Sequence, residues 1–273
     1  MPQIIPIDDP DDPRIEPYRD VRERDLVGRD GLFIAEGAVV VRSLVASTRY
    51  RARSLLLAGK RVEALEPMLA QLPPGTPVYT ASQPVLDRIA GFPLHRGILA
   101  LGEKTAIPTA ADLLESCGPV ARVAMLFGIG NHDNMGGIFR NAAAFGADAV
   151  ILDAGCCDPL YRKAIRVSVG ATLLVPTARL AAGEDPLVLL DRFGFEAVAL
   201  SPAGTETLAA LTPPRRAALL FGSEGPGLPP ALLARARSVR IPMAGGFDSL
   251  NVATTSGIVL HHIASGQAAL DPA

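Results

Sequence analysis

The sequence predicts an α/β protein whose C-terminal half is a doubly wound parallel sheet, preceded by a small α/β domain. Three observations predict this class. Apolar strand-like runs alternate with helical segments along the chain. The run 218–221 (ALLF) is apolar throughout, as a strand buried on both faces requires. Polar, glycine-containing loops follow several of the predicted strands, where ligands of such sheets bind.

The first domain is expected over residues 1–105. Residues 1–13 are rich in Asp and Pro, so we expect them to be loosely attached. Three segments with the apolar repeat of a helix follow, at 14–29, 37–46 and 62–72. Four short apolar runs predict strands, at 32–35, 54–58, 77–80 and 97–101. The connection between the first and the second domain is expected within residues 102–120, with the domain boundary near residue 106.

The second domain, residues 106–273, has a stronger alternation of strands and helices. Its predicted strands share short apolar runs and lie at 120–127, 149–152, 172–175, 196–200, 217–221 and 238–241. Its predicted helices lie at 135–145, 160–167, 187–193, 230–237 and 250–265. Such a sheet brings the loops after its strands to one edge.

Composition excludes several classes of protein. The chain has 273 residues, of which 49% are hydrophobic and 20% charged, as in a globular protein. No apolar run is long enough to span a bilayer, and the acidic start lacks the basic region of a signal peptide. Three cysteines without a CxxC pair fit reduced thiols in the cytoplasm. The four histidines have no metal-like spacing, so no metal is expected.

The net charge of −2 gives no argument for nucleic acid binding, but the charge is unevenly distributed. Residues 37–62 contain six basic residues and no acidic one. Arg42, Arg49, Arg51 and Arg53 in this stretch are candidate RNA-phosphate contacts. An ordinary solvated surface, balanced by the acidic first thirty residues, explains the pattern equally well.

The first polar loop runs from Gly128 to Arg140 (GIGNHDNMGGIFR). It begins like a dinucleotide-binding GxGxxG motif, but Asp133 occupies the third glycine position, which argues against a dinucleotide-dependent oxidoreductase. Asn134 is instead the predicted cap of the following helix. Arg140 then falls in the second turn of that helix.

The second loop, residues 221–229 (FGSEGPGLP), has three glycines within six residues and carries Glu224. It is too short for a nucleotide phosphate loop and lacks the Lys-Ser/Thr ending, which argues against a nucleoside triphosphatase. The glycines indicate a tight backbone that comes close to a ligand or to another segment.

The third loop, residues 241–252 (IPMAGGFDSLNV), precedes the long last helix. Ser249 is the predicted N-cap of this helix. Asn251 then falls in its first turn, where the side-chain amide can point into a site.

Taken together, these loops resemble the SpoU (TrmH) family of RNA ribose methyltransferases, in the SPOUT superfamily. The matching segments, in family order and spacing, are 134–146, 163–171 (KAIRVSVGA), 221–228 and 241–243 with 249–252. One departure is Ala253, where the family usually has serine. The segments 33–37 (FIAEG) and 95–97 (HRG) resemble the family's accessory domain, which is similar to a ribosomal RNA-binding protein.

The resemblance implies S-adenosylmethionine (AdoMet) as methyl donor, a C-terminal trefoil knot and a homodimer with active sites near its interface. It implies a cofactor site at Gly222, Ile241 and Leu250. It implies catalytic roles for Arg140, Asn134, Glu224, Ser249 and Asn251.

The family assigns activation of the ribose 2′-hydroxyl to the arginine matched by Arg140. A free guanidinium is a poor base, so we favour a different role, in which Arg140 binds an RNA phosphate and stabilises the developing alkoxide. The proton of the ribose 2′-hydroxyl then goes to Arg140, to water or to a phosphate oxygen. The accessory domain slightly favours ribosomal over transfer RNA. The alternative is a catalytically inert RNA-binding protein of the same fold.

Overall fold

The computed structural model describes residues 2–20, 31–94, 97–105, 108–245 and 249–268. The chain packs into two compact units, Met1–Ala106 with Leu160–Leu174, and Ile107–Pro159 with Val175–Ala273. The predicted helix over 14–29 lies partly outside the described residues, as do the predicted boundary near 106 and the first two residues of the 95–97 segment.

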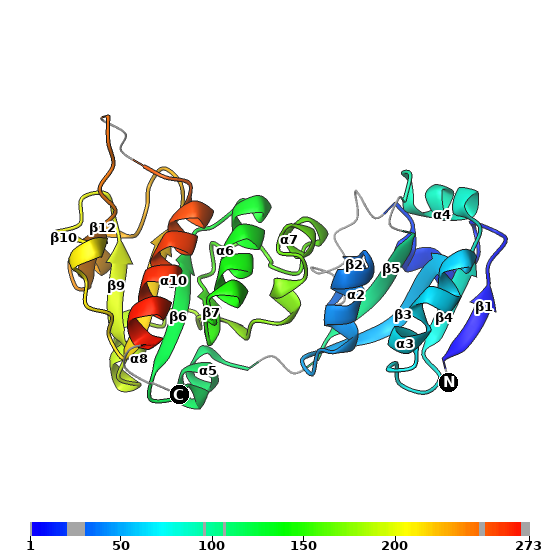
Figure 1. Ribbon diagram of the computed structural model, residues 1–273, viewed down its shortest axis with the longest axis horizontal. Coiled ribbons are helices and arrows are strands. Elements are labelled where there is room, and N and C mark those ends of the chain that lie inside the picture. Colours follow the sequence, from blue (N-terminus) through cyan, green and yellow to red (C-terminus); the bar gives the residue numbers. More distant parts are fainter. Residues whose placement is uncertain (1, 21–30, 95–96, 106–107, 246–248, 269–273) are drawn as a thin grey trace. The chain divides into compact units, whose positions relative to one another are not determined.

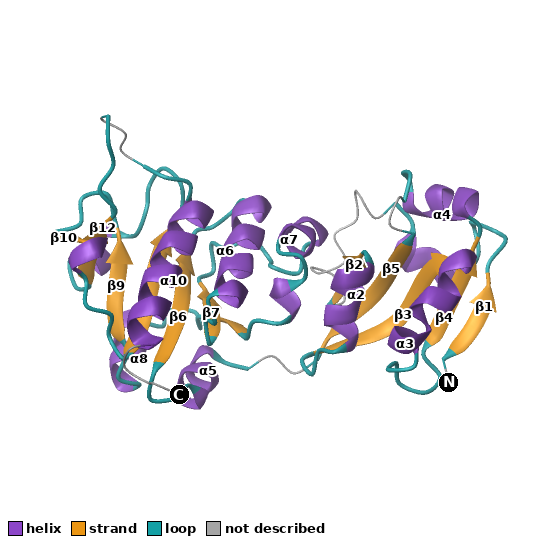
Figure 2. Cartoon of the chain, viewed as in Figure 1, coloured by secondary structure: helices purple, strands orange, loops and turns teal. Residues whose placement is uncertain are grey.

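The first unit contains a five-stranded mixed sheet in the order β1-β4-β3-β5-β2 (Figures 1 and 2). Its strands are β1 (Gln3–Pro6), β2 (Leu32–Glu36), β3 (Tyr50–Ala58), β4 (Pro77–Ala81) and β5 (Ile98–Lys104). Its helices are η1 (Pro13–Tyr18), α2 (Ala38–Val45), η2 (Gly59–Arg61), α3 (Val62–Leu69), α4 (Gln83–Ala90), α7 (Arg162–Val167) and η3 (Ala171–Leu173).

Both faces of this sheet are covered by apolar side chains. Strand β3 shows the alternation: Leu55 and Leu57 belong to one buried cluster, with α2 and α3, and Leu56 to the other, with η1 and α4. Since successive strand residues point to opposite faces, a run such as 55–58 is apolar throughout. Tyr18 is fully buried in the second cluster, where its hydroxyl lies 2.8 Å from Ser54 Oγ.

The structure corrects the prediction for the start of the chain. Residues 3–6 are not loosely attached but form β1, which pairs in parallel with β4, and Ile7 is buried. The isoleucines among the Asp and Pro residues supply the apolar contacts that the composition argument overlooked. Helix α4 was not predicted, although proline in its first turn and Gly91 at its end, with φ +75°, are signals for it.

Residues 160–174, placed by the prediction in the second domain, pack within the first unit. Ile165 and Leu173 are buried in the same cluster as Leu44. Arg162 forms a 2.6 Å ion pair with Glu36.

The predicted strand over 172–175 was wrong. Gly170 adopts φ +85° and starts η3, and Pro176 lacks an N–H, so the chain joins the sheet only at β8 (Thr177–Arg179).

The second unit contains a seven-stranded sheet in the order β10-β12-β9-β11-β6-β7-β8, in which every pairing is parallel. The strands not yet given are β6 (Ala121–Phe127), β7 (Ala149–Leu152), β9 (Glu196–Leu200), β10 (Glu206–Thr207), β11 (Arg216–Gly222) and β12 (Arg237–Arg240). The helices are α5 (Ala110–Ser116), α6 (His132–Ala144), α8 (Pro186–Arg192), η4 (Leu208–Ala210), α9 (Pro230–Leu233) and α10 (Val252–Ala268). The helix predicted over 230–237 is shorter in the structure, where it ends at Leu233 and Arg237 already belongs to β12.

Helices cover both faces of this sheet. Side chains of α5, α8 and α9 share one buried cluster with β6 and β11. Helix α10 lies alongside α6 and also contacts β11 (Figure 1). The end of α10 is fixed by Gln267, which is 1% exposed and donates from Nε2 to the carbonyls of Ala121, Pro214 and Arg215 at 2.7–3.2 Å. Its Oε1 accepts from Arg122 Nε at 2.7 Å. The central strands and this helix pair bring the three polar loops to one edge of the sheet.

Candidate functional site

A cavity of about 430 Å³ lies at the carboxyl edge of the second unit's sheet, beyond β9, β11 and β12. Six of the residues predicted for the site are among those that line it: Gly222, Glu224, Ile241, Ser249, Leu250 and Asn251. The position agrees with the rule that ligands of parallel sheets bind outside the carboxyl ends of the strands.

The glycine-rich loop after β11 turns back sharply onto itself. A Cβ atom built on Gly222 would lie 2.2 Å from the carbonyl carbon of Gly227, so no larger residue fits without moving the loop. Gly225 and Gly227 have φ +89° and +70°, which L-residues rarely adopt. The turn therefore presents Glu224 at the cavity on a tightly constrained backbone.

Asn134 belongs to the first turn of α6. It is not the helix cap, as predicted: Asn131 is, because Asn131 Oδ1 accepts from the backbone N–H groups of Asp133 at 2.7 Å and Asn134 at 3.4 Å. With the cap supplied by Asn131, the buried Asn134 side chain donates from Nδ2 to Glu224 Oε1 at 3.0 Å. Two asparagines three residues apart made the cap ambiguous in the sequence.

Asn251 joins the third loop to the other two. Its Oδ1 accepts from the N–H groups of Ala253 and Thr254 at 2.9 and 3.2 Å, so Asn251, not Ser249 as predicted, caps α10. Its Nδ2 donates to Asn134 Oδ1 at 2.8 Å and to Glu224 Oε1 at 3.1 Å. Asn134, Glu224 and Asn251 thus form a closed set of hydrogen bonds that ties the three loops together beside the cavity.

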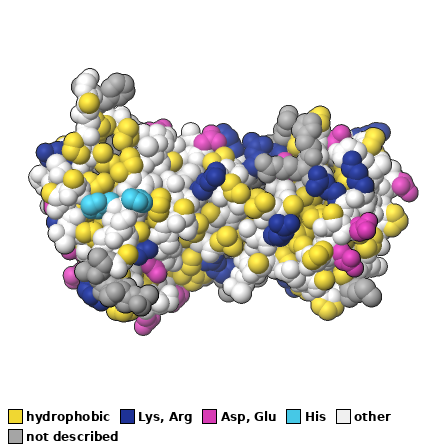
Figure 3. All heavy atoms as spheres, viewed as in Figure 1, with side chains coloured by type: hydrophobic (Ala, Val, Ile, Leu, Met, Phe, Trp, Pro, Cys, Tyr) yellow, Lys and Arg dark blue, Asp and Glu magenta, His cyan; other side chains and the backbone are white. Residues whose placement is uncertain are grey.

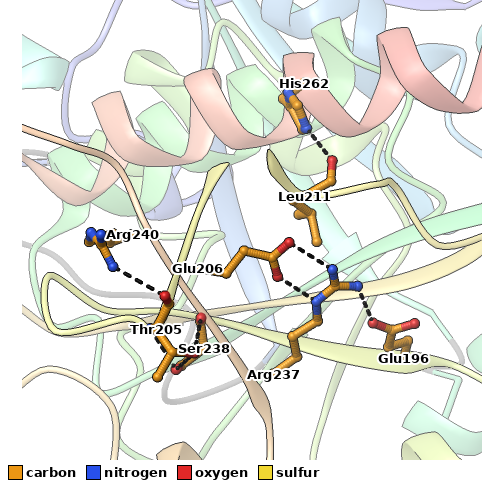
Figure 4. A network of polar contacts seen from close by, with 8 residues as sticks. All are labelled: Glu196, Thr205, Glu206, Leu211, Arg237, Ser238, Arg240 and His262. Carbon is orange, nitrogen blue, oxygen red and sulfur yellow. Dashed lines mark hydrogen bonds and ion pairs between the residues drawn. The ribbon is translucent and has the colours of Figure 1, made fainter. Parts of the chain in front are cut away.

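An ion-pair network holds β12, whose end leads into Ile241 (Figure 4). Arg237 donates to Glu206 at 2.7 and 2.9 Å and to Glu196 at 2.9 Å. These hydrogen bonds lower the pKa of Glu206 and raise the pKa of Arg237. The network joins β12 to β10 and β9, so it helps to fix one wall of the cavity.

Arg140 and Asn134 are the predicted catalytic residues that do not line the cavity. Asn134 lies beside it through its hydrogen bonds with Glu224 and Asn251, whereas Arg140 is exposed on α6. The helix itself is held close to α10, because a Cβ on Gly137 would lie 2.7 Å from Ala253 Cβ. Arg140 therefore lies on a surface that is open to a large substrate.

The four arginines predicted to bind RNA lie in the first unit and differ in their surroundings. Arg42 and Arg51 are exposed, and Arg53 is exposed but forms a 3.3 Å ion pair with Glu103. Arg49 donates to the carbonyls of Leu173 and Leu174, and burial lowers its pKa. Its contacts indicate a structural role. On the face drawn in Figure 3, basic side chains occur in several groups separated by hydrophobic and neutral ones.

Sequence reasoning missed part of the cavity wall. Leu200, Ser201 and Pro202, at the end of β9, and Thr255, on α10, also line it. The signal was available, because β9 was predicted correctly and the loop after the strand next to β11 must reach the same edge of a parallel sheet.

The described residues contain no group of three or more His, Cys, Asp or Glu side chains able to hold a metal ion. Cys117, Cys156 and Cys157 are free, and burial raises the pKa of each to about 11 or 12, which disfavours the reactive thiolate. Within the same ranges, no helix combines the length and apolar character needed to cross a bilayer.

Comparisons with known proteins identify the family of this chain. The model of the SpoU rRNA Methylase family matches residues 121–261. An uncharacterized tRNA/rRNA methyltransferase of Mycobacterium bovis is 42% identical over 275 residues, covering 94% of this chain and 93% of the relative. The AdoMet-bound rRNA methyltransferase of Sinorhizobium meliloti has a similar structure, with a TM-score of 0.80 and 26% identity over 96% of this chain and 97% of that one.

A putative RNA methyltransferase of the TrmH family from Porphyromonas gingivalis is also similar, with a TM-score of 0.76 and 26% identity over 91% of this chain and 96% of that one. The fold and the site together define an RNA methyltransferase. The chain belongs to the SpoU rRNA methylase family.

Proposed function

We propose that this protein transfers the methyl group of AdoMet to a ribose 2′-hydroxyl of structured RNA. AdoMet is the methyl donor, as the similar AdoMet-bound rRNA methyltransferase of Sinorhizobium meliloti supports. The observation that carries the proposal is the hydrogen-bonded set of Asn134, Glu224 and Asn251 beside the cavity. It joins the three loops through which the chain resembles the ribose methyltransferases.

The cavity fits the donor in size and chemistry. Its volume of about 430 Å³ lies within the range of small-molecule sites, and its walls combine apolar side chains with backbone groups of a glycine loop. Gly222, Ile241 and Leu250 would hold the adenosine part of the donor. When bound, AdoMet supplies an electrophilic methyl group on a sulfonium sulfur.

The chain's own contribution to the reaction is chiefly positioning and charge stabilisation. Glu224, Asn251 and Ser249 orient the loops and the target nucleotide. Arg140 binds the RNA phosphate with its planar fork of donors and stabilises the negative charge that develops on the attacking oxygen. Its exposure on α6 leaves the guanidinium accessible to RNA.

We further propose the knotted topology and the homodimer of the family. In support of a homodimer, Ile258 is a large apolar side chain on α10 that is 40% exposed. Arg140 lies on α6, which packs against α10, so a dimer formed through these helices would place it near the interface.

For the first domain, residues 1–105, we propose RNA binding, with ribosomal RNA favoured, and for residues 106–273 the transferase role. Arg42 and Arg51, both exposed, remain candidate phosphate contacts. Replacing either by Glu should weaken RNA binding by about three- to tenfold at low salt and leave AdoMet affinity unchanged. Full-length protein is needed for this test, because residues 160–174 pack with the first unit.

The decisive experiment incubates the full-length chain with AdoMet and unmodified ribosomal RNA, and then maps the 2′-O-methyl positions. One or a few new 2′-O-methyl sites are expected, and they should form much more slowly with the Arg140→Ala variant. Methylation of a base instead of a ribose would refute the proposal. AdoMet binding without transfer to any ribosomal or transfer RNA would indicate the inert RNA-binding protein.

A further inference from the structure

Glu224 is the one charged side chain among the described residues that line the cavity. The rest of the lining is apolar or neutral, including Ser201, Ser223, Ser249, Asn251 and Thr255. Any electrostatic discrimination by this cavity between small ligands of different charge therefore depends strongly on one carboxylate.

The surroundings of Glu224 leave its negative charge uncompensated. Its Oε1 accepts hydrogen bonds from two neutral amides, those of Asn134 and Asn251. Within the part of the chain that the structure describes, no Lys, Arg or His nitrogen forms an ion pair with it. Amide donors fix the position of the carboxylate without neutralising it.

The donor and the product of the transfer differ by one methyl group and by the positive charge that this group places on the sulfur. The donor AdoMet carries a positive sulfonium, whereas its product, S-adenosylhomocysteine, has a neutral thioether and otherwise the same adenosine and amino-acid groups. Contacts with the apolar walls and backbone are common to both ligands, so they contribute little to discrimination.

On the basis of the proposed donor, we propose that Glu224 is a specificity-determining residue that makes the cavity select for the cationic donor over the neutral product. The fixed, unpaired carboxylate attracts the additional positive charge of AdoMet and gives no equivalent stabilisation to the thioether. Because Glu224 is exposed, water and salt weaken the attraction, so we expect a preference of about three- to tenfold at low ionic strength. The same preference would help the product to leave after transfer.

The test measures dissociation constants by calorimetry for AdoMet, for S-adenosylhomocysteine and for sinefungin, which carries an amine in place of the sulfonium. Full-length wild type, Glu224→Gln and Glu115→Gln are compared. Gln retains a side-chain oxygen that can accept from Asn134 and Asn251. Glu115 is an exposed residue of α5 that does not line the cavity, so it controls for the change in net charge.

Glu224→Gln should weaken the binding of AdoMet and of sinefungin by about three- to tenfold and change the affinity for S-adenosylhomocysteine by less than about twofold. Glu115→Gln should change none of the three affinities. In the wild type, the preference for AdoMet over S-adenosylhomocysteine should shrink between about 50 and about 500 mM salt. Equal weakening of all three ligands, or a preference independent of salt, would overturn the inference and leave Glu224 with a purely structural role. If the folded wild type bound none of the three ligands, the proposed function itself would fail.

Discussion

The tight turn after β11 makes Gly222 the most informative position to perturb. In the Gly222→Ala variant, the new methyl group would lie 2.2 Å from Gly227 C and 2.3 Å from Leu228 N, both of them backbone atoms. Ordinary contacts begin near 3.4 Å, so the turn must open by about 1 Å. Overpacking of this kind costs about 1–3 kcal/mol.

The displaced backbone forms part of the cavity wall, so the effect should be greater on ligand binding than on folding. A wall displaced by about 1 Å should weaken AdoMet binding by about 10- to 100-fold, equivalent to about 1.4–2.8 kcal/mol. The assay is calorimetric titration of AdoMet, with thermal unfolding measured on the same samples.

Gly183→Ala is the matched control. Gly183 lies in the same unit with φ +77°, and no atom lies within 4 Å of the point where the alanine methyl group would be, so its replacement costs only backbone strain, about 1–2 kcal/mol. It should lower the melting temperature without changing AdoMet affinity. Wild-type AdoMet affinity in Gly222→Ala would refute the assignment of this turn to the cofactor site.

Three further predictions concern other parts of the molecule. Gln267→Leu should lower the free energy of unfolding by about 2–4 kcal/mol in chemical denaturation, because three carbonyls and Arg122 Nε each lose a hydrogen bond; a loss below about 0.5 kcal/mol would contradict the role given to this side chain. The Glu206–Arg237 pair should stabilise the protein above the ordinary pKa of glutamate and cease to do so as the pH falls through the lowered pKa of Glu206. The difference in melting temperature between wild type and Glu206→Gln should therefore be largest near neutral pH and vanish in acid; a constant difference would rule this linkage out. Arg140→Ala and Arg140→Lys should both slow single-turnover methylation, with AdoMet affinity unchanged. The activation free energy should rise by about 2–4 kcal/mol in the alanine variant and by less in the lysine variant. Near-wild-type rates in the alanine variant would remove Arg140 from the mechanism.

The sheet of the second unit could be predicted from the sequence because burial on both faces leaves a clear pattern. The runs at 196–200 and 217–221 are apolar over their whole length or nearly so, and they form neighbouring strands β9 and β11. Prediction of the site followed from this, since parallel strands place the loops after them at one edge. The choice of Gly222, Ile241 and Leu250 as cofactor-site residues came from the family resemblance, and all three line the cavity.

Interactions between distant segments could not be predicted in the same way. Arg49 was counted as a free cation because its neighbours in the sequence are basic, yet its guanidinium is held by carbonyls about 125 residues away. Residues 160–174 were assigned to the second domain because a predicted helix (160–167) and a predicted strand (172–175) continued its alternation. Their apolar side chains are instead buried with those of the first unit. Local periodicity identifies which face of a segment is apolar and carries no information about which core receives it.

The predicted helix caps were wrong, and the reason also explains the geometry of the site. Asparagine is both a good cap and a donor of two side-chain N–H groups, and local sequence does not say which capacity a given residue uses. At α6 the two roles are divided, because Asn131 caps the helix and leaves Asn134 free to bind Glu224. At α10 one residue performs both, since Asn251 caps with Oδ1 and reaches Asn134 and Glu224 with Nδ2. The start of the last helix and the geometry of the site are therefore fixed by the same side chain, so a change at Asn251 cannot alter one without disturbing the other.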